Sequence, residues 1–170
     1  MIRKSTHKDI PALLLLFDEA RATIAALGIN QWQNGYPSRE VVTLDIERGE
    51  SYVYIEDGKI VATFAMLRDT EPTYDRIYDG EWLSGDTDRY VAVHRFAISL
   101  SERGRGLATK ILTFVEEYAI REGKPSIRID THEGNVVMRK MLSKNGFSHC
   151  GTITLEYGDA RVAYEKRLRA

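Results

Sequence analysis

Six consecutive residues decide the fold of this chain: Arg103-Gly104-Arg105-Gly106-Leu107-Ala108. A β-type run over residues 90–98 precedes them, and a helical run over residues 107–121 follows. The segment therefore predicts a strand, a glycine-rich turn and the N-terminus of a helix. The first N–H groups of a helix have no partner within it, and the helix dipole is positive at that end, so such a turn can hold a phosphate. The alternative is that the glycines only turn the chain and both arginines are solvated.

Two other phosphate-binding patterns fit the sequence less well. No G-x-x-x-x-G-K-[ST] is present, which excludes a P-loop. A dinucleotide-binding fold requires G-x-G-x-x-G, and Thr109 stands at the third glycine position. Asp130 lies about where a ribose-binding acid would be, but residues 99–102 separate the strand from the glycines, unlike in a Rossmann turn. A Rossmann fold is therefore the weaker alternative.

Two motifs in a fixed order give the chain a family resemblance. Arg103-x-x-Gly106-x-Ala108 matches [Q/R]-x-x-G-x-[G/A], which is typical of the GNAT superfamily of N-acetyltransferases. Residues 135–147, Asn135-x-x-Met138-x-x-Met141-Leu142-x-x-x-Gly146-Phe147, resemble that family's N-x-x-A-x-x-L-Y-x-x-x-G-F. The order of elements resembles the family over nearly the whole chain, and the expectations about coenzyme A below are implied by this resemblance.

Length and composition are consistent with a single domain over residues 1–170. Hydrophobic residues make up 43% of the chain, which suffices for a core, and the net charge of −1 gives no reason to expect nucleic acid or an anionic membrane as a partner. The longest run of large apolar residues, Leu13 to Phe17, is far too short to span a membrane. The single cysteine, Cys150, and the lack of an apolar leader lead us to expect a cytoplasmic protein.

Apolar periodicity and turn residues predict the remaining elements. Thr6-x-x-Asp9 resembles a capping box, and Asp57-Gly58 is a strong hairpin signal. Strands are expected over residues 1–4, 51–56, 59–68, 90–98, 126–131, 147–157 and 161–167. Helices are expected over about residues 10–28, 39–48, 107–121 and 135–145. The predicted fold is α/β, a GNAT-like mixed, mostly antiparallel sheet of about seven strands flanked by about four helices.

A polar and aromatic connector over residues 29–37 contains the candidate acceptor-binding residues Trp32 and Tyr36. In the family that this chain resembles, the region between the first two helices often lines the acceptor pocket. Both rings could form that wall, and an equally good interpretation is that Trp32 plugs the core beneath a loop.

An insert over residues 69–88 is rich in acids and carries three aromatic rings, those of Tyr74, Tyr78 and Trp82. Acidic and aromatic groups together suit a cationic amine substrate, through charge attraction and cation–π contact. For most of these acids we favour the other interpretation, a solvated loop with a few anchoring rings.

The resemblance also implies how coenzyme A binds. Family members splay the strand before the glycine loop away from the strand after the helix, and the pantetheine arm pairs with the backbone exposed there. The pyrophosphate binds at the glycine loop. Asn135, which opens the helix predicted over residues 135–145, matches the family position that contacts the pantetheine arm, and Arg139 lies one turn later. The candidate cofactor-binding residues are Phe96, Ala97, Ile98, Arg103, Gly104, Arg105, Gly106, Leu107, Ala108, Thr109, Asn135 and Arg139. Arg139 could reach a phosphate or be an ordinary exposed helix arginine.

Amine acetylation benefits from a base, because the acceptor must lose a proton before it attacks. His94 is the candidate, since it lies on the splayed strand where several family members place acid/base groups and its ring titrates in a suitable range. A packed or surface-facing histidine is the alternative. A backbone N–H of the same strand would polarise the thioester carbonyl. No metal site is expected, because the other histidines show no ligand spacing.

Leu142 is a departure from the family pattern, which often has at this position a tyrosine that protonates the leaving thiolate. A thiol of pKa about 8.5 is a tolerable leaving group as the anion. Tyr157 or Tyr164 could substitute, and nothing in the sequence selects one.

The resemblance therefore predicts an acyltransferase that moves an acetyl group from acetyl-CoA to an amine. The alternative is a non-catalytic CoA-binding sensor or regulatory module, for which Leu142 is the only support. The expected partner is a small-molecule or protein amine acceptor, with no nucleic acid and no membrane, and a homodimer is a possible assembly.

Overall fold

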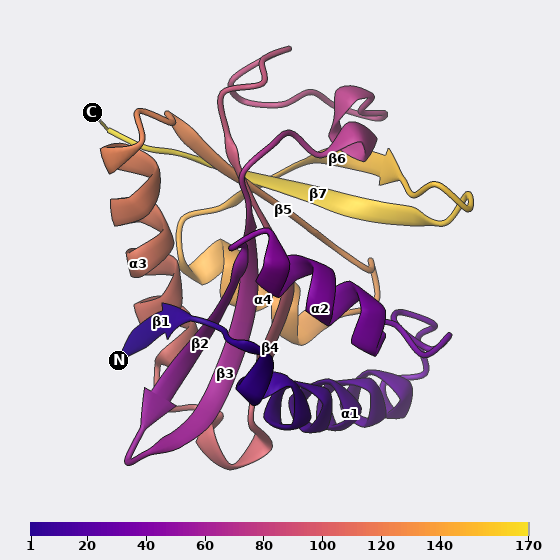
Figure 1. Cartoon of the computed structure of the whole chain (residues 1–170). Coiled ribbons are helices and arrows are strands. Elements are labelled where there is room, and N and C mark those ends of the chain that lie inside the picture. Colours follow the sequence, from indigo (N-terminus) through magenta and orange to yellow (C-terminus); the bar gives the residue numbers. More distant parts are fainter. Residues whose placement is uncertain (170) are drawn as a thin grey trace. The chain divides into compact units, whose positions relative to one another are not determined.

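The structure is a computed structural model that describes residues 1–169. Seven strands form one sheet in the order β1-β2-β3-β4-β5-β7-β6 (Figure 1). The strands are β1 (Ile2–Lys4), β2 (Ser51–Glu56), β3 (Lys59–Leu67), β4 (Val91–Ile98), β5 (Ser126–Thr131), β6 (Ser148–Thr154) and β7 (Ala160–Arg167). The α-helices are α1 (Ile10–Ala26), α2 (Arg39–Glu47), α3 (Leu107–Arg121) and α4 (Val136–Lys144), and short 3-10 helices are η1 (His7–Asp9), η2 (Pro72–Asp75) and η3 (Leu100–Glu102).

The predicted fold class is confirmed. The pairs β1–β2, β2–β3, β5–β7 and β6–β7 are antiparallel, and β4–β5 is parallel. No helix within residues 1–169 is both long and apolar enough to cross a membrane. Contacts divide the chain into two compact units, of which the first comprises Met1–Met66 and His94–Ile111. The second comprises Leu67–Val93 and the residues from Leu112 onward.

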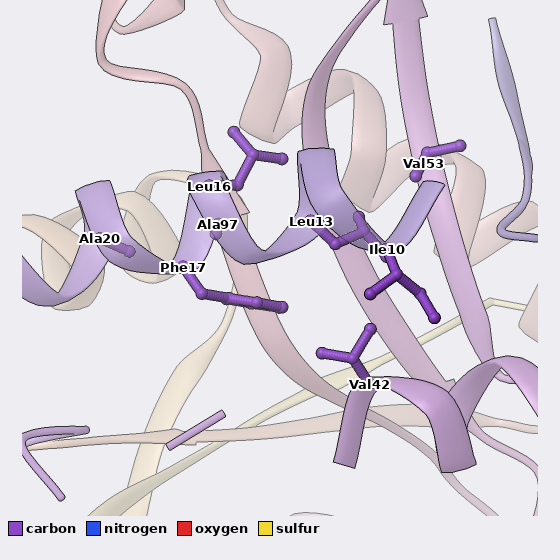
Figure 2. Close-up of a cluster of buried hydrophobic side chains, with 8 residues drawn as sticks. All are labelled: Ile10, Leu13, Leu16, Phe17, Ala20, Val42, Val53 and Ala97. Carbon is purple, nitrogen blue, oxygen red and sulfur yellow. The ribbon is translucent and has the colours of Figure 1, made fainter. Parts of the chain in front are cut away.

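The first unit has its core where α1 and α2 cover β2, β3 and β4. The buried members are Ile10, Leu13, Leu16, Phe17, Ala20, Val42, Val53 and Ala97. Figure 2 shows Val42 reaching from α2 toward the side chains of α1. Their spacing along α1 places one apolar stripe of the helix against the sheet. Each large side chain buried in this way stabilises the fold by about 1.5–3 kcal/mol.

Local signals position the elements of this unit as the sequence predicts. The Thr6 N–H donates to Asp9 Oδ2 at 2.7 Å, which completes a capping box before α1. Arg3 donates twice to the same carboxylate, at 2.8 and 3.0 Å, and these bonds hold the pKa of Asp9 below its ordinary value. Asp57 and Gly58 have φ of +50° and +73°, as the two central residues of a type I′ turn require.

The second unit packs the insert over residues 69–88 against β5, β6 and β7. The insert contains η2, and Tyr78 forms an isolated bridge with Thr152 of β6. Tyr74 and Trp82 are buried in a cluster with Tyr90, Ala92, Cys150, Ile153 and Ala163. Tyr74 and Trp82, two of the three rings of the insert, therefore anchor this unit. This agrees with the interpretation of the insert as a solvated loop with a few anchoring rings. Cys150 is buried, as expected of a small apolar side chain.

Candidate functional site

Strand β4 is regular at its start and irregular from His94 onward. Its register with β5 comprises Val91↔Ile127 and Ala92↔Arg128, whereas the register of β5 with β7 comprises six pairs. Val91, Ala92 and Val93 are all buried, whereas the next three residues are all half-buried. Within this second segment Arg95 has a φ of +51°, in the left-handed region that a regular strand does not use.

The Arg95 side chain connects β4 to two other segments of the first unit. Its Nε and Nη2 atoms donate to Asp45 Oδ2 and Oδ1 of α2 at 2.5 and 2.7 Å. Its Nη1 atom donates to the Tyr36 hydroxyl at 2.7 Å. The side chains of Arg95 and Asp45 are 11% and 10% exposed, so this ion pair is largely shielded from water. The arrangement is the planar bidentate geometry that arginine forms with a carboxylate.

Both groups of this pair remain charged. Burial alone would lower the pKa of Arg95, but Tyr36 and Asp45 outweigh that effect and raise it. Burial raises the pKa of Asp45, and Arg95 opposes that rise. Because both carboxylate oxygens of Asp45 accept hydrogen bonds from the guanidinium, we assign the ionised form to Asp45.

The two predicted acceptor-wall residues lie beside this pair. Trp32 is half-buried, has a φ of +63°, and packs edge-on against Phe17 of the core with ring centroids 5.8 Å apart. Its other neighbour is Tyr36, at 6.3 Å between centroids, and Tyr36 is 37% exposed. One side of the Trp32 ring therefore touches the core and part of the ring remains accessible, and its role in an acceptor wall stays a prediction.

The glycine loop has the backbone form that an anion-binding turn requires. Gly104 and Gly106 have φ of +77° and +78°, and a side chain added at either would meet no atom within 4 Å. Leu107 is buried and begins α3, with the Lys110 N–H donating to the Gly106 carbonyl at 3.2 Å. A helix N-terminus preceded by this open glycine backbone is a geometry that fits a pyrophosphate.

The two arginines of the loop differ in their surroundings. The Arg103 side chain is exposed, and no ion pair or hydrogen bond of it is found within residues 1–169. Arg105 instead forms an ion pair with Glu102 and lies 3.5 Å from a carboxylate oxygen of Glu56. Arg103 therefore contributes the uncompensated positive charge of this loop.

The remaining candidate residues lie in the second unit. Asn135 is the N-cap of α4, and its side chain accepts a hydrogen bond from the Met138 N–H at 3.2 Å. Arg139 donates to the Tyr164 hydroxyl at 2.9 Å and to the Glu133 carbonyl at 3.0 Å. Arg139 is therefore not simply an exposed helix arginine, and a phosphate would have to compete with these two bonds.

Burial and contacts describe the three residues considered for protonation of the leaving thiolate. Leu142 is fully buried in the core, and Tyr157 is 69% exposed at the end of the β6–β7 hairpin. Tyr164 is 2% exposed, and its hydroxyl already accepts the bond from Arg139. Neither tyrosine gains support from its surroundings. Within residues 1–169, no group of three or more His, Cys, Asp or Glu side chains could hold a metal ion.

Sequence reasoning missed Arg95 and Asp45. They lie 50 residues apart, and no local motif marks either of them. A left-handed φ at an arginine within a strand is uncommon, and nothing in the sequence around residues 94–96 predicts it. The ion pair became visible only through the tertiary arrangement.

Known proteins resemble the chain in sequence and in structure. It is 26% identical over 171 residues to S-(2-succino)cysteine N-acetyltransferase of Bacillus subtilis (strain 168), covering 98% of this chain and 95% of that protein. It is 28% identical over 126 residues to S-alkylcysteine N-acetyltransferase of the same organism, covering 72% and 62%. A crystal structure of a GNAT-family acetyltransferase from Streptococcus agalactiae 2603 superposes with a TM-score of 0.88 at 42% identity, covering 100% and 96%.

The family model that matches this sequence spans most of it. The match covers residues 17–147, which include the connector, β4, the glycine loop and α4. The family is described as the acetyltransferase (GNAT) family. The resemblance drawn from the two motifs is thereby confirmed, and the catalytic reading is favoured over a non-catalytic sensor. The chain belongs to the acetyltransferase (GNAT) family and is an N-acetyltransferase that transfers an acetyl group from acetyl-CoA to an amine.

Proposed function

We propose that the acceptor is the α-amino group of a small amino acid, with S-substituted cysteines as the first candidates. The observation that carries the proposal is the irregular segment of β4, where His94 directly precedes the residue that anchors the aromatic connector. Two N-acetyltransferases that resemble the chain over much of its length are named for S-(2-succino)cysteine and S-alkylcysteine. A half-buried aromatic wall suits a small amine with an apolar or thioether side chain, and His94, next to Arg95 in sequence, is the proposed base.

In this proposal the glycine loop holds the pyrophosphate of acetyl-CoA. The N–H groups that open α3 and the exposed Arg103 guanidinium are the donors. Backbone groups of Phe96, Ala97 and Ile98 are the proposed partners of the pantetheine arm, since among the described residues the register of β4 with β5 comprises Val91 and Ala92. Asn135 and Arg139 are the proposed contacts from α4.

His94 takes the proton of the acceptor ammonium, directly or through a water molecule. The free amine then attacks the thioester carbonyl carbon, so that a C–N bond forms as the C–S bond breaks. A backbone N–H of the irregular segment donates to the oxygen on which negative charge develops. The sulfur leaves as the thiolate, because Leu142 can donate no proton and a thiol of pKa about 8.5 tolerates departure as the anion. The nitrogen is cationic after its attack and gives its second proton to this thiolate or to water, so that the products are a neutral amide and coenzyme A.

A cationic amine, such as a polyamine or a lysine side chain, is the second candidate acceptor. It is favoured by the exposed acids of the insert: Asp69, Asp75, Asp79, Glu81, Asp86 and Asp88. Exposed Arg68, Arg76 and Arg89 offset part of that charge, and Tyr74 and Trp82 are buried. Attraction by exposed acids is screened over about 10 Å at about 0.1 M salt, so it would make kcat/KM fall as ionic strength rises.

A panel of acceptors tests the proposal. Release of free thiol from acetyl-CoA should be measured with S-alkylcysteine, S-(2-succino)cysteine, spermidine and a lysine-containing peptide, at low and high salt. We expect kcat/KM for at least one S-substituted cysteine to exceed that for spermidine by about tenfold or more, which corresponds to 1.4 kcal/mol. The matched control is the same amino acid with its nitrogen already acetylated, which should give no turnover.

Two results of this panel would contradict the proposal. A preference for spermidine or the peptide that weakens at high salt would show that the acceptor is a cationic amine. Turnover of the N-blocked control would show hydrolysis and not acetyl transfer. Multiple turnovers with any acceptor would also eliminate the non-catalytic sensor.

A further inference from the structure

Backbone strain in this chain is concentrated at two unusual residues. Within residues 1–169, four residues other than glycine have positive φ: Trp32, Asp57, Asp79 and Arg95. The two aspartates are of a type that tolerates this region, and Asp57 lies in a hairpin turn that requires it. A tryptophan and an arginine are unfavourable there, at roughly 1–3 kcal/mol each, and persist only where surrounding contacts determine the conformation.

These two strained residues are linked through one side chain. The Tyr36 ring packs against Trp32, and its hydroxyl accepts the bond from Arg95 Nη1. The remaining donors of the guanidinium that face α2 are held by the Asp45 carboxylate. One arginine therefore joins three segments of the first unit: β4 beside His94, helix α2 and the connector over residues 29–37.

A cavity adjoins this junction. It is small, with about 10 Å³ of space for the centre of a water molecule, and its lining includes Asp45 and Arg95 together with Ser51 and Thr63. Apolar side chains of α1, α2 and β3 complete the lining: Leu13, Phe17, Val42, Phe64 and Ala65. Because polar as well as apolar side chains face this space, the position of the junction depends on the hydrogen bonds that Arg95 makes as well as on packing.

We propose that Arg95 is a positioning and specificity-determining residue, which holds the aromatic connector in place as the acceptor wall beside His94. This inference rests on the proposed function, since it takes the connector as the wall and His94 as the base. Through its hydrogen bond to Tyr36, Arg95 affects the binding of the acceptor. Through its φ of +51°, Arg95 sets the direction of the β4 backbone next to His94. Acetyl-CoA binding at the glycine loop does not depend on the hydroxyl of Tyr36.

The first test removes a single hydroxyl. Tyr36→Phe should raise the KM of the acceptor about tenfold, because the hydrogen bond to a charged group is lost, and should leave the KM of acetyl-CoA unchanged. Tyr118→Phe is the matched control, since it removes a hydroxyl on α3 that takes no part in the site. A purely structural role of the hydroxyl would lower stability without separating the two KM values.

The second test uses the geometry of the guanidinium. Arg95→Lys keeps the charge opposite Asp45 but lacks the planar fork that serves Asp45 and Tyr36 together. We expect Arg95→Lys to reproduce the acceptor KM of Tyr36→Phe, and the double variant to be no worse than Arg95→Lys alone. Additive effects in this cycle would show that the two residues act independently and would overturn the proposal.

A third measurement needs no acceptor. Trp82 is 6% exposed, so quenching of tryptophan fluorescence by neutral acrylamide reports mainly on the half-buried Trp32. Tyr36→Phe should increase quenching, and Tyr118→Phe should not. If quenching is unchanged in Tyr36→Phe, Arg95 does not hold the connector in place through Tyr36, and the proposal is overturned even if no acceptor of the panel reacts. Increased quenching with an unchanged acceptor KM overturns the role in specificity while the proposed function stands.

Discussion

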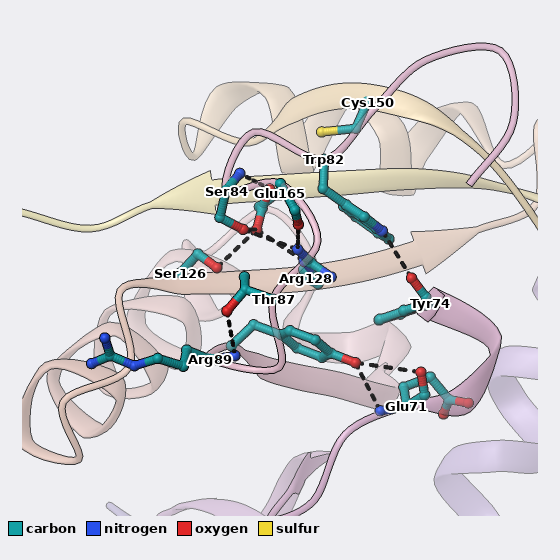
Figure 3. Close-up of polar contacts among 12 residues, drawn as sticks. Glu71, Tyr74, Trp82, Ser84, Thr87, Arg89, Ser126, Arg128, Cys150 and Glu165 are labelled. Atoms are coloured by element: carbon teal, nitrogen blue, oxygen red, sulfur yellow. Dashed lines mark hydrogen bonds and ion pairs between the residues drawn. The ribbon is translucent and has the colours of Figure 1, made fainter. Parts of the chain in front are cut away.

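The two units each contain a shielded arginine–carboxylate pair, and the pairs differ in what holds them. Arg128 of β5 donates from Nε to Glu165 of β7 at 2.9 Å, and the two side chains are 2% and 0% exposed. The Arg128 guanidinium lies 4.2 Å from the ring centroid of Trp82 and 4.3 Å from that of Tyr90. Figure 3 shows Arg128 and Glu165 lying with Ser84 and Ser126 in one group of polar contacts.

Within residues 1–169, the polar contacts of the Arg128 pair all come from residues of the same unit. Ser84 and Ser126 donate to Glu165 at 2.5 and 2.8 Å, and Arg128 Nη2 donates to the Gly85 carbonyl at 2.9 Å. The Arg95 pair differs in two respects: its arginine has a strained φ, and its third partner is the 37% exposed Tyr36. A saturated pair between rings on regular strands indicates structure, whereas a strained pair with an accessible partner indicates function.

The largest expected effect is the loss of stability when the Arg128–Glu165 pair is broken. Arg128→Met leaves Glu165 as a buried charge without its partner, which typically costs about 3–5 kcal/mol. The free energy of unfolding from urea titration measures this loss. Arg121→Met is the control, since Arg121 is exposed and lies 5.7 Å from the Tyr118 ring; its cost should stay below about 1 kcal/mol. A similarly small cost for Arg128→Met would remove the distinction between the two pairs.

The next effect concerns the glycine loop. At free CoA about 100 times its Kd, binding should add about 2.7 kcal/mol to the stability of the wild type, and Gly106→Val should abolish this gain because its side chain occupies the phosphate seat. Gly123→Val is matched, with a φ of +69° and open space, but it lies at the other end of α3. Thermal shift with and without CoA separates the two variants. If CoA stabilises Gly106→Val as much as Gly123→Val, the loop does not bind the cofactor.

A smaller effect follows from the acid–base behaviour of Glu165. Burial alone would raise its pKa, but hydrogen bonds from Ser84, Arg128 and Ser126 outweigh burial and lower it. The stabilisation is therefore present above the unfolded pKa of about 4.3 and is lost as pH falls through the lower folded value. Glu165→Gln should be less stable than the wild type at pH 7, and the difference should shrink toward pH 3. A constant difference over this range would mean that Glu165 is not ionised in the folded state.

Local chemistry explains how much of the fold the sequence predicts. The β2–β3 hairpin follows from Asp57-Gly58, α3 begins at the predicted Leu107, and β5 has its predicted bounds. Each of these features depends on neighbours within a few residues. The ends of β6 and β7 were predicted less well, because the turn between them begins at Leu155, within the strand that the sequence favours.

In the candidate site, too, the features that depend on neighbouring residues were predicted and those that join distant residues were not. The glycine loop and Asn135 are recognisable as motifs, and the structure gives them the expected turn and N-cap. The Arg95 cluster joins residues 50 and 59 positions apart, and the partners Arg128 and Glu165 are 37 apart. Such pairs are determined by the packing of helices and strands, so a single sequence carries no local signal for them.

The central claim is that the irregular segment of β4 carries the chemistry through His94. It is tested most directly by the pH dependence of kcat/KM for the acceptor in the wild type, in His94→Ala and in the control His7→Ala, whose side chain is exposed on η1. Between pH 5 and 8, where imidazoles titrate, the wild type and His7→Ala should lose activity on the acid side. His94→Ala should turn over roughly 100- to 10,000-fold more slowly, without that acid limb and with the KM of acetyl-CoA unchanged. A profile of His94→Ala that follows the wild type in rate and shape would contradict the claim.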